Sequence, residues 1–180
     1  MSALVVYESI YGNTDSVAHA IAQGIGEVMP VSVVNVNHVS ASTLLAIDLL
    51  VVGGPTHIHG MSLPMTRAAA ISAASATLPL DVDAGGTGVR EWLDGIETSA
   101  RYSAAFDTRV DMPTWMTGAA APFISQLLCA RGLEAIAAPE GFLVTDETKL
   151  IATEFTRAKR WGLSLALAAS VRLPPPPACE

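Results

Sequence analysis

The chain has little cysteine, and this absence removes two classes of structural site. Its only two cysteines, Cys129 and Cys179, lie far apart without C-x-x-C spacing, so neither a disulfide framework nor a zinc site is expected. Cys129 falls on an apolar helical stretch and is predicted to be a buried, unreactive thiol. Cys179, near the end of the chain, is predicted to be an exposed free thiol.

Positive charge is also scarce. No lysine or arginine precedes Arg67, and 10 basic against 17 acidic residues give a formal net charge of −7. A protein that binds nucleic acid needs basic surfaces for the phosphate backbone, so that class of partner is excluded. The acidic balance instead favours partners with positively charged surfaces.

Long apolar runs are missing as well. No stretch is long enough to span a bilayer, and the early run Leu4-Val5-Val6 is too short for a signal peptide. A cytoplasmic protein is therefore expected. The 180 residues, 51% of them hydrophobic, suffice for one α/β domain, predicted over residues 1–172. Residues 173–180 contain four consecutive prolines and are predicted to form a tail that is extended or disordered.

The most informative stretch is the turn at residues 8–14. It follows Ala3–Tyr7, an apolar and β-branched run typical of a buried strand, and precedes a helical pattern that ends near Gly24 and Gly26. A glycine and two hydroxyl residues between a strand and a helix N-terminus suit a phosphate site, because free N–H groups and the helix dipole favour an anion. A simple helix N-terminus capped by Asn13 or Thr14 is an equal alternative on these residues alone.

This turn resembles the phosphate loop of flavodoxins, in which Thr or Ser is followed by any residue, Thr, Gly, Asn or any residue, and Thr. The resemblance implies that the loop wraps the phosphate of FMN without a positive side chain. It differs at one position, where Tyr11 replaces a second threonine. The FMN contacts implied by the loop are Ser9, Ile10, Tyr11, Gly12, Asn13 and Thr14.

Two further segments extend the resemblance. The apolar strand predicted at 47–52 runs into Gly53-Gly54-Pro55-Thr56, similar to the flavodoxin loop that lies along the flavin ring. The strand predicted at 102–106 is followed by a third loop at 107–110. The flavin contacts implied by these segments are Pro55, Thr56, His57, Gly60, Phe106, Asp107, Thr108 and Arg109. For Arg109, a contact with the flavin and an ion pair with Asp107 or Asp111 are both open.

The alternation of strands and helices predicts an α/β protein with a three-layer α/β/α sandwich. The resemblance implies a flavodoxin-like, five-stranded parallel sheet in the order 2-1-3-4-5. The other predicted strands are 31–36 and a last strand at 133–144 that is broken around Pro139. The predicted helices after the first are 42–45, one that starts at Pro64 within the segment 63–78, 89–94, 117–131 and 153–170. The last is predicted to have Glu154 on a solvated face.

Competing sites fit the sequence poorly. A response-regulator receiver needs an acidic cluster after the first strand, and Glu8 is alone there. A Rossmann dinucleotide site needs G-x-G-x-x-G in that place, which is missing. The loop at 81–88 lacks the ligand pattern of a calcium site, and His57 with His59 lack a third ligand, so no metal is predicted.

Three functions stay open on the sequence. The first is an FMN oxidoreductase of the quinone-reductase or protoporphyrinogen-oxidising kind, with segment 63–78 as a substrate lid and Arg67 as an acceptor contact. The second is a one-electron carrier flavodoxin that serves redox partner proteins. The third is a flavodoxin-fold module that no longer binds FMN. The resemblance also allows a homodimer.

Overall fold

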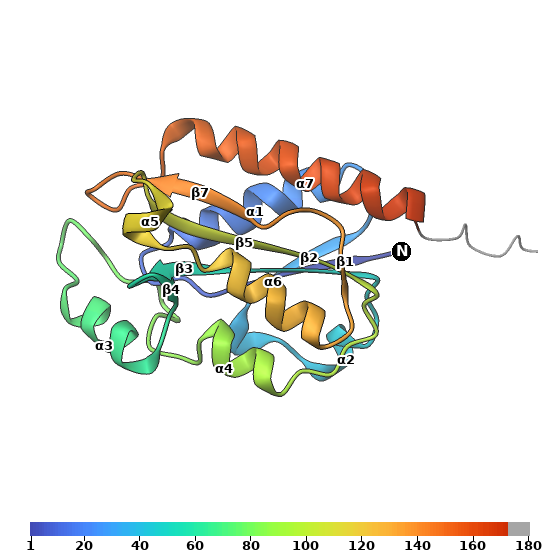
Figure 1. Cartoon of the computed structure of the whole chain (residues 1–180), viewed down its shortest axis with the longest axis horizontal. Coiled ribbons are helices and arrows are strands. Elements are labelled where there is room, and N and C mark those ends of the chain that lie inside the picture. Colours follow the sequence, from blue (N-terminus) through green and yellow to red (C-terminus); the bar gives the residue numbers. More distant parts are fainter. Residues whose placement is uncertain (173–180) are drawn as a thin grey trace, which may run out of the picture.

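The protein is a three-layer α/β/α sandwich built on a seven-stranded sheet, seen here in a computed structural model that describes residues 1–172 (Figure 1). The strands are β1 Ala3–Tyr7, β2 Val31–Asn35, β3 Leu49–His57, β4 Gly60–Met61, β5 Tyr102–Val110, β6 Glu134–Ala135 and β7 Glu140–Val144. The helices are α1 Asn13–Ile25, α2 Ala41–Leu44, α3 Pro64–Ser72, α4 Val89–Asp94, α5 Thr114–Thr117, α6 Ala121–Ala130 and α7 Ala152–Arg172, with a 3₁₀ turn at Val36–His38. The proline-rich segment 173–180, including Cys179, lies outside the described residues.

The main path of the sheet runs in the order β2-β1-β3-β5-β6. Strands β6 and β7 both pair in parallel with β5, β6 with its first residues and β7 with its second half. They are the two pieces of the last predicted strand, on either side of Pro139. The predicted order 2-1-3-4-5 is therefore confirmed. The short strand β4 adds an antiparallel hairpin to the end of β3.

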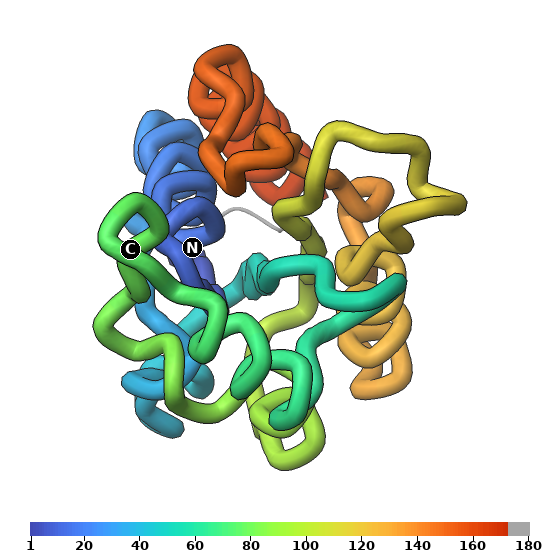
Figure 2. The backbone as a smooth tube through the Cα atoms, turned by 90° about the vertical axis from the view of Figure 1, so that its left-hand side faces the viewer, coloured from blue at the N-terminus to red at the C-terminus, as the bar shows by residue number. Residues whose placement is uncertain are grey.

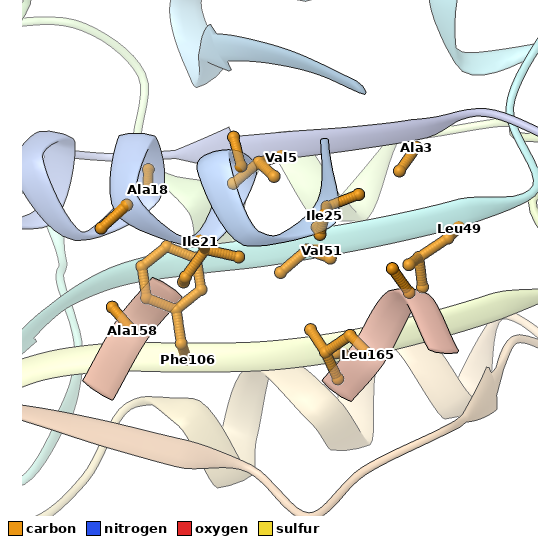
Figure 3. Packing of buried hydrophobic residues seen from close by; sticks show 14 of the residues in the cluster. Ala3, Val5, Ala18, Ile21, Ile25, Leu49, Val51, Phe106, Ala158 and Leu165 are labelled. Carbon is orange, nitrogen blue, oxygen red and sulfur yellow. The ribbon is translucent and has the colours of Figure 1, made fainter. Parts of the chain in front are cut away.

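Two apolar cores lie on opposite faces of the sheet. Helices α1 and α7 cover one face, and α2, α4 and α6 cover the other (Figure 1). In the first core, Ile21 of α1 and Leu165 of α7 lie on the same face of the sheet as Val51 and the ring of Phe106 (Figure 3). Burial on both faces explains why the strands read as continuous apolar runs in the sequence.

Three segments differ from their predictions. Strand β3 continues through Gly53–His57, because residues 53–55 pair with β5 and residues 56–57 pair with β4. Strand β5 continues through Asp107–Val110, because these residues pair with β7. The helix predicted at 117–131 is two helices, α5 and α6, separated at Gly118, whose φ is 72°.

Two side chains also differ from their predictions. Cys129 is exposed, because the buried face of α6 is formed by Ala121, Ile124 and Leu128 instead. Glu154 is buried, and it accepts a 2.9 Å hydrogen bond from the backbone N–H of Leu143 and binds Arg157. No helix within residues 1–172 is both long and apolar enough to cross a membrane.

Candidate functional site

The carboxyl ends of β1, β3, β5 and β7 surround a cleft, at the end of the sheet seen in Figure 2. In doubly wound sheets this end is where ligands bind. The cleft is lined by residues from the turn after β1, from the ends of the other three strands and from the turn after β7. These are Ile10, Tyr11, Asn13, Thr14, Pro55, Thr56, His57, Thr108, Arg109, Val110, Val144 and Thr148.

The turn after β1 brings an uncapped helix N-terminus to the cleft. Helix α1 starts directly after Gly12, whose φ is 81°. No side chain caps the N-terminus of this helix. The hydroxyl of Ser9 accepts a 3.0 Å hydrogen bond from the N–H of Gly12, which holds the turn closed. A Cβ built on Gly12 meets no atom within 4 Å, so the space in front of the helix is open. The first N–H groups of α1 are thus available to an anion.

The two side chains expected as helix caps are used elsewhere. The amide of Asn13 donates to the carbonyl of Thr148 at 2.8 Å and accepts from the N–H of Leu150 at 3.0 Å. Thr14 and Thr108 share a buried hydroxyl–hydroxyl bond of 2.8 Å, which joins α1 to the end of β5. Each side chain therefore ties the turn after β1 to another wall of the cleft, and the capped-helix alternative does not describe α1.

Tyr11 has a partner that its position in the motif does not predict. Its hydroxyl donates a 2.6 Å hydrogen bond to the carbonyl of Ala70 on α3. Burial raises the pKa of Tyr11, so the hydroxyl stays protonated and keeps this donor role. The hydroxyl of Tyr11 therefore does not lie within the loop; it binds the loop to α3, in the segment that follows β4.

That segment is also held by a buried polar network. Glu8 accepts from the hydroxyl of Ser62 and from the N–H of Val89 at 2.8 Å. Arg67 donates to Ser62 and to Glu91, both at 3.1 Å, and is 7% exposed. The prediction that Arg67 contacts an acceptor is therefore wrong, because its guanidinium is buried and bonded to Ser62 and Glu91. Burial raises the pKa of Glu8.

The end of β3 forms a tight hairpin with β4. Its turn residues Ile58 and His59 have φ of 40° and 69°. The N–H of His59 donates to the carbonyl of Thr117 at 3.2 Å, which fixes the hairpin against α5. His57 lines the cleft, and burial, followed by the charge of Arg67, lowers its pKa. Its imidazole is therefore neutral at neutral pH.

Thr56 and Asp107 hold α6 against the cleft. The hydroxyl of Thr56 accepts from the N–H of Ala120 at 2.9 Å, and Oδ2 of Asp107 accepts from the N–H of Ala121 at 2.8 Å. Asp107 is fully buried, and burial raises its pKa. This carboxylate caps α6 and does not line the cleft, which corrects its expected contact with the flavin.

The structure thus brings most of the residues implied by the resemblance to one cleft, but not all. The ring of Phe106 is fully buried against Phe142 and Trp161, at centroid distances of 6.2 and 6.4 Å, so it is unavailable to a ligand in the cleft. Gly60 faces Phe123 on α6. Ser9 and Gly12 shape the turn without lining the cleft.

Val144 and Thr148 line the cleft and were missed from the sequence, while Val110, which also lines it, belongs to the third predicted loop. Thr148 could have been found, since its turn follows the last parallel strand and the carboxyl ends of all parallel strands lie at one end of the sheet. No cluster of three or more metal-ligating side chains occurs in residues 1–172.

The fold and the cleft define a doubly wound α/β protein with an uncharged anion loop after its first strand. The flavodoxin family model matches residues 5–86, which include this loop and the end of β3. The chain has a flavodoxin-like fold, as its sequence motifs predict. The uncapped start of α1 suits an anionic group such as a phosphate.

Solved structures agree on the fold over 94% or more of the chain. A flavodoxin from the domain Archaea is 21% identical with a TM-score of 0.69, covering 94% of this chain and 99% of its own. Flavodoxin 1 from Bacillus cereus is 16% identical with a TM-score of 0.61, covering 97% of this chain and 100% of its own.

A larger protein contains a similar unit. Rubredoxin oxygen:oxidoreductase from Desulfovibrio gigas is 15% identical with a TM-score of 0.63, over 95% of this chain and 36% of its own. No curated protein matches the chain significantly in sequence. At these identities the structures establish the shared fold.

Proposed function

We propose that the chain binds FMN in the cleft at the carboxyl end of the sheet and transfers electrons from it to a quinone-like acceptor or a redox partner protein. The observation that carries this proposal is the uncapped, open N-terminus of α1 beside the ends of β3 and β5. Backbone N–H groups would hold the phosphate, as in other uncharged phosphate loops. FMN itself would supply the redox chemistry.

The chain's own residues would orient and shield the cofactor. Asn13 and Thr14 join the phosphate turn to the turn after β7 and to β5, so the walls of the cleft are held at fixed separation. Pro55, Thr56 and His57 form a wall at the end of β3, and Thr56 is fixed by its bond to Ala120. Such preorganisation lowers the entropic cost of binding a ligand.

A one-electron carrier is the second candidate, and the net charge of −7 supports it. Acidic proteins are steered toward basic partner surfaces, which suits a carrier between proteins. An enzyme with a small acceptor needs no such steering. The cytoplasmic location and the homodimer stay predictions from the sequence and the resemblance.

Anaerobic photoreduction of the protein loaded with FMN tests the proposal and separates the two candidates. The enzyme predicts passage to the two-electron-reduced flavin, followed by rapid reoxidation when a soluble quinone is added. A carrier predicts accumulation of the one-electron-reduced flavin and slow reaction with quinone. If added FMN keeps the absorption and fluorescence of free FMN, the proposal is wrong and the chain is a module without its cofactor.

A further inference from the structure

Arg109 is the single positively charged residue that lines the cleft, as far as residues 1–172 are concerned. It lies at the end of β5, next to Thr108, which is bonded to Thr14 at the start of α1, and its side chain is 18% exposed. Its Nε atom is buried and has no hydrogen-bond partner within residues 1–172. A guanidinium usually fills its donors with carboxylates or carbonyls, so Arg109 keeps hydrogen-bonding capacity that residues 1–172 leave unused.

The nearest carboxylate does not fill this role. Oδ1 of Asp107 lies 3.8 Å from Nε of Arg109, which is an ionic distance but longer than a hydrogen bond, and Oδ1 is also without a partner among the described residues. The other oxygen of Asp107 is bound to the N–H of Ala121. Asp107 therefore forms an ion pair with Arg109 through Oδ1, while its Oδ2 stays hydrogen-bonded to the first residue of α6.

Glycine at position 141 makes room for this arrangement. A Cβ there would lie 2.9 Å from Nε of Arg109, 3.0 Å from Oδ1 of Asp107 and 3.1 Å from Nη2 of Arg109. The guanidinium thus lies close over the backbone of β7, which limits its movement. A side chain at 141 would displace it.

The other cations near the cleft are already engaged. Arg67 is bound to Ser62 and Glu91. Lys149, in the turn after β7, is paired with Glu147 at 2.7 Å. A negative charge that develops in the cleft would therefore be stabilised chiefly by Arg109, and more strongly than in water because the site is partly desolvated.

We propose that Arg109, held by Asp107 and Gly141, forms an anion subsite in the cleft that stabilises the anionic, two-electron-reduced form of the bound flavin. This inference rests on the proposed binding of FMN and specifies what the site does to it. A flavin that takes up two electrons and one proton carries one negative charge on its ring. Stabilising that charge raises the two-electron potential and disfavours, relative to it, the neutral form that carries one electron and one proton.

The test compares variants of the protein loaded with FMN. Arg109→Gln removes the charge and keeps a hydrogen-bond donor, while Arg109→Lys keeps the charge. Arg160→Gln is the matched control, because Arg160 is an exposed residue of α7 and loses the same charge. The readouts are the affinity for oxidised FMN, the midpoint potential and the affinity for sulfite. Sulfite bonds through its sulfur lone pair to flavin N5, with no leaving group, and makes the ring anionic.

The expected result is a loss of sulfite affinity of about tenfold or more in Arg109→Gln. The two-electron potential should fall by about 30 mV for each tenfold loss of stabilisation of the reduced form. Arg109→Lys should restore most of both values, and Arg160→Gln should leave both near those of the original protein. A merely structural role of Arg109 would change FMN affinity or stability without moving the potential.

Two outcomes would overturn the inference, and they are distinguishable. If Arg109→Gln binds FMN and matches Arg160→Gln in potential and sulfite affinity, Arg109 does not stabilise the reduced flavin. If the original protein binds no FMN, the proposed function itself fails, and the inference with it.

Discussion

Tyr11 shows at the residue scale how a change in a motif gains a new structural role. Flavodoxin phosphate loops usually have a threonine in this place, and here the longer side chain reaches past the loop to the carbonyl of Ala70. The loop keeps its uncapped N–H groups, so an anion site survives the substitution. The hydroxyl instead connects the candidate cofactor site to α3.

Removing this hydroxyl should loosen α3. We expect Tyr11→Phe to lower the free energy of unfolding by about 0.5–1.5 kcal/mol, the usual net contribution of one hydrogen bond. Amide hydrogen exchange in α3 should also become faster. Urea unfolding and exchange mass spectrometry would measure the two effects.

Tyr102→Phe is the matched control. Tyr102 lies at the start of β5, away from the cleft, and its hydroxyl donates a 3.2 Å hydrogen bond to the carbonyl of Arg172 at the end of α7. It should not change exchange in α3. Equal exchange in α3 for both variants would contradict the role of Tyr11 as a tether.

Glu8 should make stability depend on pH. Because burial raises its pKa in the folded state, its contribution to stability is fully present below the unfolded pKa and is lost as the pH rises through the folded pKa. Glu8→Gln stays neutral and keeps an acceptor for the N–H of Val89. Between the unfolded and the folded pKa of Glu8, the free energy of unfolding of Glu8→Gln should therefore rise relative to that of the original protein, by up to about 1.4 kcal/mol per pH unit.

Urea unfolding of both proteins at several pH values, from just below 4.5 upward, measures this difference. The pKa of Asp107 is also raised by burial, but Asp107 is present in both proteins. The difference between their stabilities therefore reports the titration of Glu8 alone. Parallel stability profiles for the two proteins would show that Glu8 does not titrate in this range.

The sequence could not predict which polar residues are buried. Asp107 and Arg67 read as surface charges or ligand contacts, yet both are buried and bonded within the protein. Their partners, Ala121 and Glu91, are distant in sequence and come together only through the packing of α6 and α4. A pattern of local residues carries no signal for such pairs.

At the scale of elements, α1 and α7 pack unusually closely. A Cβ at Gly24 would lie 1.9 Å from the carbonyl oxygen of Lys159, and one at Gly162 would lie 2.1 Å from that of Ile21. Two glycines, one on each helix, therefore let the backbones touch. The glycine near the end of α1 reads in the sequence as a helix end, but its main role is this contact.

This contact predicts an unusual response to alanine. In a helix interior, Gly→Ala normally stabilises by up to about 1 kcal/mol. Gly162→Ala should instead lower the free energy of unfolding by about 1–3 kcal/mol, because the methyl group forces the helices apart. Chemical denaturation measures the change.

Gly95→Ala provides the control, since a Cβ at Gly95 meets no atom within 4 Å. Its stability should stay within about 0.5 kcal/mol of the original. A Gly162→Ala protein as stable as this control would contradict the close packing of α1 and α7.

Elements were easier to predict than their ends. Strand and helix types follow from apolar runs and helical spacing, and the order of the sheet follows from the resemblance. The ends of β3 and β5 were missed because Gly53–His57 and Asp107–Val110 have loop-like composition, and only pairing with neighbouring strands extends them. The break at Gly118 depends on close contact with His59, which the local sequence does not indicate.

For the whole molecule, cofactor binding and stability should be linked. FMN that binds only the folded protein should raise the free energy of unfolding by about 2.7 kcal/mol at a free concentration 100 times its Kd. Thermal or urea unfolding with increasing FMN measures this gain. A midpoint that does not change with FMN would contradict specific binding to the folded state.

The central claim is that the turn after β1 holds the phosphate of FMN, and a binding titration of two glycine variants tests it most directly. Gly12 and Gly132 have φ of 81° and 86°, and neither has an atom within 4 Å of a built Cβ. Aspartate tolerates this conformation better than most residues, so both variants should fold. Gly12→Asp puts a negative charge at the phosphate site, while Gly132→Asp puts the same charge after α6.

We expect the original protein and Gly132→Asp to quench FMN fluorescence with similar affinity and to bind riboflavin, which lacks the phosphate, much more weakly. Gly12→Asp should lose FMN affinity by about tenfold or more, since each 1.4 kcal/mol of lost interaction is tenfold in Kd. Equal binding of FMN and riboflavin, or equal FMN affinity in the two variants, would show that the turn after β1 is not the phosphate site.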